Sequence, residues 1–278
     1  MNVPARLLGF AVLVAGAFAL AFGVGAAADL GPTEASPEHA TEGGHESAAR
    51  VDPVRGLAVS EGSLTLDLAQ TRRAAGRRSE LRFAIRDADD HVVRDFDREH
   101  TKRMHVIVAR RDLTGFQHLH PTQAADGSWS VPATLGRPGT YRVFADFSTH
   151  DTPRTLGADL TVDGPVRSRA LPAPTGTVAV DGMEVALTSG AGKAGREADL
   201  DFEVTRGGKP VHVEPYLGAR GHLVALREGD LAFLHVHPDR DRLRFIAEFP
   251  SAGRYRLFLQ FKTAGRVHTA AFTRAVPK

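Results

Sequence analysis

The sequence predicts an all-β protein in which two tandem β-sandwich domains follow one N-terminal hydrophobic helix. Short runs of alternating or β-branched residues, separated by Gly, Pro and Asp, fill the chain after its first segment, as is typical of antiparallel sandwiches. No stretch beyond the N-terminal segment keeps a 3.6-residue apolar period, so little helix is expected there. The two halves of this region also repeat each other, which indicates two copies of one domain.

The N-terminal segment is typical of an export signal. From Leu7 to Ala28 the chain carries no charge, and Arg6 and Asp29 flank this apolar stretch. Its length exceeds the roughly 7–15 apolar residues of a signal peptide and reaches the roughly 20 that span a bilayer, whereas the small residues 25–28 suit a signal peptidase. We therefore interpret residues 1–30 as a signal peptide or transmembrane anchor. Either predicts an extracytoplasmic protein, anchored to the cell membrane by its N-terminal helix or secreted.

Residues 31–54 form a predicted disordered linker, because they are rich in Ala, Glu, Gly, Pro and Ser and have few apolar side chains. The remaining length leaves room for two domains of about 100 residues each. We place one β-sandwich at residues 55–165 and the other at residues 174–278. The stretch Gly164–Pro174, which holds three prolines, separates them.

Charge and cysteine content exclude several classes of function. The formal net charge is +2, with basic and acidic residues interspersed, so no nucleic-acid partner is expected. There is no cysteine, which excludes disulfides, thiolate metal sites, iron–sulfur clusters and cysteine nucleophiles. Any metal ligand must therefore come from His, Asp, Glu, Met or a backbone oxygen.

The repeat is clearest around a shared histidine pattern. Aligning His105 with His222 places MHVIVARRDLTGFQHLHP over GHLVALREGDLAFLHVHP without a gap. Further on, PGTYRVFADF matches AGRYRLFLQF. Tyr141 and Tyr255 then begin equivalent strands after a Gly turn, where a sandwich places a corner tyrosine whose hydroxyl bonds the backbone. We assign both tyrosines to structure and not to chemistry.

Each copy offers one histidine at the start of a strand and a His-x-His-Pro motif 13 residues later. Alternate side chains of a strand share a face and lie about 6.5 Å apart at the backbone, and a hairpin would return the first histidine to this pair. Neutral imidazole suits Cu(II) and Zn(II). The sequence thus predicts one copper or zinc site in each domain, with His105, His118 and His120 in the first and His222, His235 and His237 in the second.

Other side chains near these motifs are weaker ligand candidates. Met104 would add a soft ligand that favours Cu(I), in the first copy only. Asp97 and Glu214 each precede the first histidine of a copy by eight residues, and each is a ligand, an orienting partner of a ligand or a solvated charge. Side chains whose positions do not match between the copies complete the set of possible fourth ligands: Glu99, His100, His150 and His268.

A structural reading of the histidines stays open. Histidines in sheets often bond the backbone, and Phe116 and Phe233 share the histidine face by alternation, which indicates that this face is partly buried. The alternative function is a structural or adhesive module whose histidines are packing and turn residues. No Ser-centred nucleophile elbow, P-loop or dinucleotide glycine pattern occurs. We therefore expect no enzyme and nominate no catalytic residue, with a metal-dependent hydrolase as a third possibility.

Through its HLHP and HVHP segments, the region of about residues 55–275 resembles actinobacterial secreted or membrane-anchored proteins with tandem YtkA-like or FixH-like domains. The resemblance implies an immunoglobulin-like or cupredoxin-like sandwich outside the membrane. It also implies a part in heavy-metal handling or metalloenzyme assembly. The function expected is therefore that of an extracytoplasmic metal buffer, chaperone or sensor, with a membrane metal transporter or a metalloenzyme as its protein partner.

Overall fold

The computed structural model describes residues 54–76, 78–189, 192–234 and 236–278. The predicted N-terminal helix and almost all of the predicted linker lie outside this part of the chain. Within the described residues, no helix has the length and apolar character needed to cross a membrane. These described residues belong to one compact unit.

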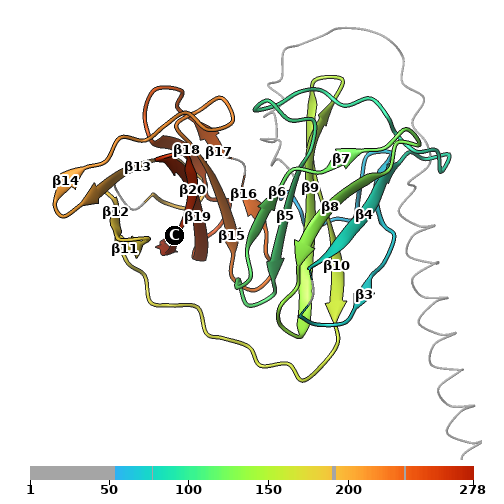
Figure 1. The fold of residues 1–278 in the computed structure, drawn as a ribbon, viewed down its shortest axis with the longest axis horizontal. Coiled ribbons are helices and arrows are strands. Elements are labelled where there is room, and N and C mark those ends of the chain that lie inside the picture. The colour runs from blue at the N-terminus through green and yellow to red at the C-terminus, as the bar shows by residue number, and fades with distance from the viewer. Residues whose placement is uncertain (1–53, 77, 190–191, 235) are drawn as a thin grey trace, which may run out of the picture. The chain divides into compact units, whose positions relative to one another are not determined.

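Every regular element of the described residues is a β-strand, and the strands group into two successive sandwiches (Figure 1). The strands of the first sandwich are β1 (Ser60–Glu61), β2 (Leu64–Leu68), β3 (Arg72–Arg73), β4 (Arg78–Arg86), β5 (His105–Arg110), β6 (Gln117–Leu119), β7 (Thr122–Gln123), β8 (Trp129–Thr134), β9 (Gly139–Thr149) and β10 (Thr152–Val162). The strands of the second sandwich are β11 (Thr177–Val180), β12 (Met183–Leu187), β13 (Glu197–Arg206), β14 (Lys209–Pro210), β15 (Gly221–Arg227), β16 (Phe233–Leu234), β17 (Val236–Pro238), β18 (Arg244–Glu248), β19 (Gly253–Thr263) and β20 (Arg266–Val276).

The strand order is immunoglobulin-like in both sandwiches. One sheet of the first sandwich runs β1-β2-β4-β8-β7 and the other β3-β10-β9-β5-β6, which reproduces the A-B-E-D and G-F-C-C′ sheets of an immunoglobulin domain. The second sandwich repeats this order, with β12-β13-β18-β17 facing β20-β19-β15-β16. The all-β prediction is thus confirmed for the described residues, in its immunoglobulin-like form.

Strand β5 shows how the sequence places the histidine face. All six of its residues are buried, although only alternate residues can face the core of their own sandwich. Val106 and Val108 pack into that core. Ile107 and Ala109 point the other way and join a separate apolar cluster with residues of β15 and β19 in the second sandwich. His105, which shares the face of Ile107, therefore points toward the second sandwich.

Two aromatic contacts hold the sandwiches together. The ring of Phe116 stacks on Phe258 with centroids 4.0 Å apart, and Phe144 meets Phe233 at 5.5 Å. The repeat makes Phe116 equivalent to Phe233, and Phe144 equivalent to Phe258. The same contact is therefore made twice with the roles of the sandwiches exchanged, as across an approximate two-fold axis. The expectation that the histidine face is partly buried is confirmed.

The tyrosine corners form as the sequence predicts. The Tyr141 hydroxyl donates to the carbonyl oxygen of Arg137 at 2.9 Å, and the Tyr255 hydroxyl donates to that of Ser251 at 2.8 Å. Both tyrosines are buried, so each hydroxyl satisfies a turn carbonyl that water reaches poorly. The assignment of these residues to structure is confirmed.

Replacing either corner tyrosine tests this role. Tyr141→Phe and Tyr255→Phe are each expected to lower the free energy of unfolding by about 1–2 kcal/mol, because each leaves a turn carbonyl without its donor. Urea unfolding followed by circular dichroism measures the change. Two variants as stable as the wild type would contradict the assignment.

Candidate metal centre

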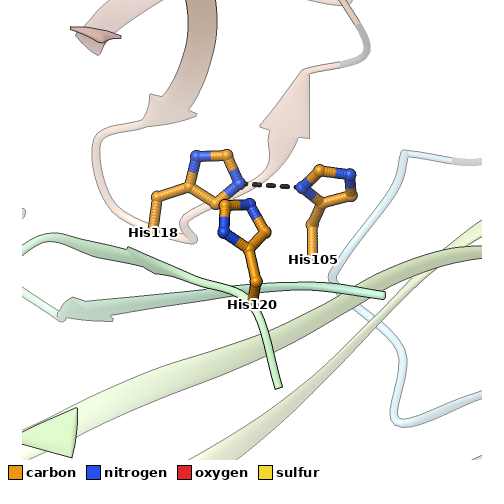
Figure 2. Close-up of side chains that lie close together, drawn as sticks. All are labelled: His105, His118 and His120. Carbon is orange, nitrogen blue, oxygen red and sulfur yellow. Dashed lines mark hydrogen bonds between the residues drawn. The ribbon is translucent and has the colours of Figure 1, made fainter. Parts of the chain in front are cut away.

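The β5–β6 hairpin brings three histidines of the first sandwich together. In its register Val106 lies opposite Leu119, and Ile107 lies opposite His118. Continuing the register by one residue places His120 across from His105, with His118 diagonal to it on the same face. The ring centroids of His105, His118 and His120 accordingly lie 4.9–5.2 Å from one another. Figure 2 shows the three rings converging on one region.

The hydrogen-bond partners of two of these rings fix their tautomers. His105 Nε2 lies 3.3 Å from the carbonyl oxygen of Glu99, and His118 Nδ1 lies 2.7 Å from Oε1 of Gln260. With these two oxygens as acceptors, each of these ring nitrogens is assigned the proton of a neutral imidazole. The other two nitrogens, His105 Nδ1 and His118 Nε2, are then both unprotonated.

These two unprotonated nitrogens point at each other. His105 Nδ1 and His118 Nε2 are 3.0 Å apart, the contact drawn dashed in Figure 2. Two lone pairs at this distance repel unless a proton or a cation lies between them. Two tetrahedral zinc ligands at 2.0–2.1 Å from the ion have nitrogens about 3.3 Å apart, so a small outward shift would admit a metal ion.

His120 supplies a third nitrogen, one that has no hydrogen-bond partner in the described residues. This atom, Nε2, is buried, and a buried polar atom without a partner costs free energy in any folded protein. One nitrogen from each of His105, His118 and His120 lies within 4.8 Å of the other two. One nitrogen from each of three imidazoles therefore shares one small volume.

Burial keeps the cluster neutral. It lowers the pKa of His105 to about 4 and that of His120 to about 4. The pKa of His118 also falls well below its usual value, through burial first and the neighbouring histidines second. Neutral imidazole is the form that binds metal ions, so the ligands are ready at neutral pH.

Of the predicted second site, the structure describes His222 and the backbone of His237. The His222 ring lies beside the first three histidines, with its centroid 6.1 Å from that of His105 and 5.9 Å from that of His118. His235 lies outside the described residues, as does the side chain of His237. The backbone of His237 belongs to β17 and faces Ile246 of β18, so it is in the other sheet from β15.

The repeated carboxylates stabilise turns. Asp97 accepts hydrogen bonds from the Ser148 hydroxyl and from the backbone N–H of Asp151, both at 2.9 Å. Glu214 accepts one from the backbone N–H of Gly265. These donors lie at the equivalent β9–β10 and β19–β20 turns, so the matching positions of the two carboxylates reflect a repeated structural contact.

The remaining candidate ligands lie at different distances from the histidine cluster. Met104 packs in the core of the first sandwich, on the opposite face of the chain from His105, and His268 contacts Asp181 at 2.6 Å. His100 does approach the cluster, with its ring 5.1 Å from that of His222. His150 is exposed at the β9–β10 turn.

A cavity of about 70 Å³ opens beside the cluster and is lined by His100, His105, His118, His222 and two carboxylates, Glu99 and Asp146. Burial raises the pKa of both Asp146 and Glu99, and in Glu99 the charge of Asp146 adds to the effect. A raised pKa means that each of these carboxyls takes up a proton more readily than an exposed one.

Sequence reasoning did not find Gln260. It lies opposite His222 in the β15–β19 ladder, just as Asp146 lies opposite His105 in the β5–β9 ladder. The repeat alignment also pairs Asp146 with Gln260. A polar residue at the same position of both copies was therefore the sequence signal that could have found Gln260.

A second group of possible ligands, Asp87, Asp89 and His91, lies in an exposed turn. Asp87 Oδ1 accepts hydrogen bonds from the backbone N–H groups of Asp89 and His91. This pattern is that of a turn-stabilising Asp, so we assign the group to turn structure.

Comparisons with known proteins give a family and distant structural likenesses. The family model described as "Domain of unknown function (DUF8832)" matches residues 58–164 and 178–278. No curated protein matches the chain.

Among solved structures, the chain is similar to the Escherichia coli adhesin FdeC, at 14% identity and a TM-score of 0.27, over 79% of this chain and 65% of that one. It is also similar to Yersinia pseudotuberculosis InvD, at 15% identity and a TM-score of 0.24, over 78% of this chain and 58% of that one. The chain thus spans less than two thirds of either structure.

Proposed function

The chain belongs to the family described as domain of unknown function DUF8832, and we propose that it binds Cu(II) or Zn(II) through His105, His118 and His120. The facing unprotonated nitrogens of His105 and His118, 3.0 Å apart, carry the proposal. A cation between them turns a repulsion into two ligand bonds. The partnerless Nε2 of His120 becomes a third.

The hydrogen-bond acceptors on the outer nitrogens of the rings, which we call outer partners, support the same conclusion. A metal-bound histidine commonly donates its other N–H to a carbonyl or a carboxylate, which fixes the ring and its tautomer. Glu99 and Gln260 provide such acceptors to His105 and His118. With no thiolate in the chain and Met104 in the core, the ligands available suit Cu(II) or Zn(II) better than Cu(I).

We place this site outside the cytoplasm, because residues 7–28 are typical of an export segment. A protein anchored to the cell membrane or secreted would act there as a metal buffer, chaperone or sensor. A membrane metal transporter or a metalloenzyme would be its partner. The proposal is for binding and not for catalysis.

The alternative, a structural or adhesive module in which the residues of the histidine face serve only packing and turns, has less support. The second sandwich covers that face, with Phe258 stacked on Phe116, so the face is not a free surface for another protein. Packing by itself would also leave the facing nitrogens of His105 and His118 without a proton between them in the assigned tautomers.

Metal titration tests the proposal. The full chain is expected to bind one equivalent of Zn(II) or Cu(II) tightly at pH 7.5, as measured by calorimetry and by metal analysis after desalting. His118→Ala and His120→Ala together should remove this binding, because too few imidazoles then remain to hold either ion tightly. His150→Ala, which changes an exposed turn histidine, is the control and should bind as the wild type does. Absence of tight binding in the wild type, or equal binding in the double variant, would overturn the proposal.

A further inference from the structure

We infer that His222 of the second sandwich is a fourth ligand of the same site, so that a bound ion joins the two sandwiches. This inference rests on the proposed metal binding by the first three histidines. It replaces two separate sites with one shared site, to which both copies of the domain contribute.

The position of the His222 ring supports this role. The side chain is 8% exposed, and its Nε2 has no hydrogen-bond partner in the described residues. A ring centroid lies about 3.2 Å from a bound ion, so two tetrahedral imidazole ligands have centroids about 5.2 Å apart. The centroid of His222 is 6.1 Å from that of His105 and 5.9 Å from that of His118. A shift of roughly 1 Å by one ring would give it tetrahedral ligand spacing.

The two-fold relation between the sandwiches explains why His222 lies here. His105 and His222 occupy matching positions at the start of β5 and β15. The Phe116–Phe258 and Phe144–Phe233 contacts set the two strands face to face, so residues that match in the repeat meet near the axis. The pair is therefore close because of a packed interface and not because of an adaptable loop.

The second sandwich also supplies an outer partner. Gln260, which lies opposite His222 in the sheet, accepts the Nδ1 proton of His118 at 2.7 Å. The second sandwich thus fixes the tautomer of a ligand from the first and offers a ligand of its own. Neither sandwich alone would hold the complete site.

Four imidazoles would close the coordination of a tetrahedral ion. Closed sites serve structure or storage, whereas catalytic zinc keeps an open position for water or substrate. His100 is exposed and lies 5.1 Å from the His222 ring, at the solvent side of the cluster.

The first test is the affinity of variants at His222. His222→Ala and the more conservative His222→Gln should each weaken Zn(II) binding at least ten-fold, since loss of even an outer partner costs about 10–100-fold. His268→Gln removes another buried histidine of the second sandwich, one that contacts Asp181 and not the cluster. This control should keep wild-type affinity. Wild-type affinity in both His222 variants would overturn the inference while leaving the three-histidine site intact.

The second test needs no variant. Hydrogen exchange of the full wild-type chain, with and without Zn(II), should show slower exchange in β15 of the second sandwich as well as in β5 and β6 of the first. Protection limited to β5 and β6 would overturn the inference. Failure of the wild type to bind Zn(II) at all would overturn both this inference and the proposed function, so the two failures are distinguishable.

Discussion

Zinc is expected to stabilise the folded chain by about 4 kcal/mol when its free concentration is 1,000 times the dissociation constant. The reason is that the ligands come from separate strands, which meet only in the folded state. His105 begins β5, whereas His118 lies on β6, and the unfolded chain does not hold them 3.0 Å apart. Urea unfolding at pH 7.5, with buffered Zn(II) and then with a chelator, measures the difference.

Two variants test whether this stabilisation by zinc comes from the proposed site. His118→Ala with His120→Ala should unfold at the same urea concentration with and without Zn(II). His150→Ala, at an exposed turn, should keep the full stabilisation. A wild-type protein that zinc does not stabilise, or a double variant that it still stabilises, would show that the ion binds elsewhere or binds the unfolded chain equally well.

Acidification is expected to destabilise the metal-free protein steeply below about pH 6.5, the usual pKa of histidine. Burial lowers the pKa of His105 and His120 to about 4 and that of His222 to about 3, and it lowers the pKa of His118 as well. Between these values and 6.5 the unfolded chain binds more protons than the folded chain. Stability is therefore complete above pH 6.5 and is lost as the pH falls toward 4, by roughly 1.4 kcal/mol per pH unit for each histidine.

Urea unfolding of metal-free protein from pH 7.5 to 4.5 measures this slope. His120→Gln should reduce it by the contribution of about one proton, whereas His150→Gln should leave it unchanged. The metal-loaded protein should hold its ion at pH 6 and release it only as the pH approaches the lowered pKa values. Stability that is flat from pH 7 to 5 would contradict the buried, neutral state of the cluster.

Much of this arrangement follows from the sequence by local rules. Strand alternation places His118 and His120 on one face, and the hairpin returns His105 to them, as the β5–β6 register shows. The repeat and the Gly-x-Tyr turns predict two sandwiches with tyrosine corners, and Tyr141 and Tyr255 both bond the backbone as expected.

The position of His222 could not be predicted in this way, because it depends on packing between the sandwiches. The apolar faces of β5 and β15 meet, and no local pattern tells which surface a domain offers to its neighbour. The two hairpins also differ after the matched histidines. β6 runs to Leu119 in the sheet of β5, whereas β17 already begins at Val236 in the opposite sheet. One strand therefore changes sheet earlier in the second copy than in the first.

X-ray absorption spectroscopy of the zinc-loaded full chain tests the central claim most directly. The account predicts a first shell dominated by imidazole nitrogens at about 2.0–2.1 Å, at least three per ion, with one fewer in His120→Ala. A shell made mainly of carboxylate or water oxygen, or one unchanged in His120→Ala, would contradict it.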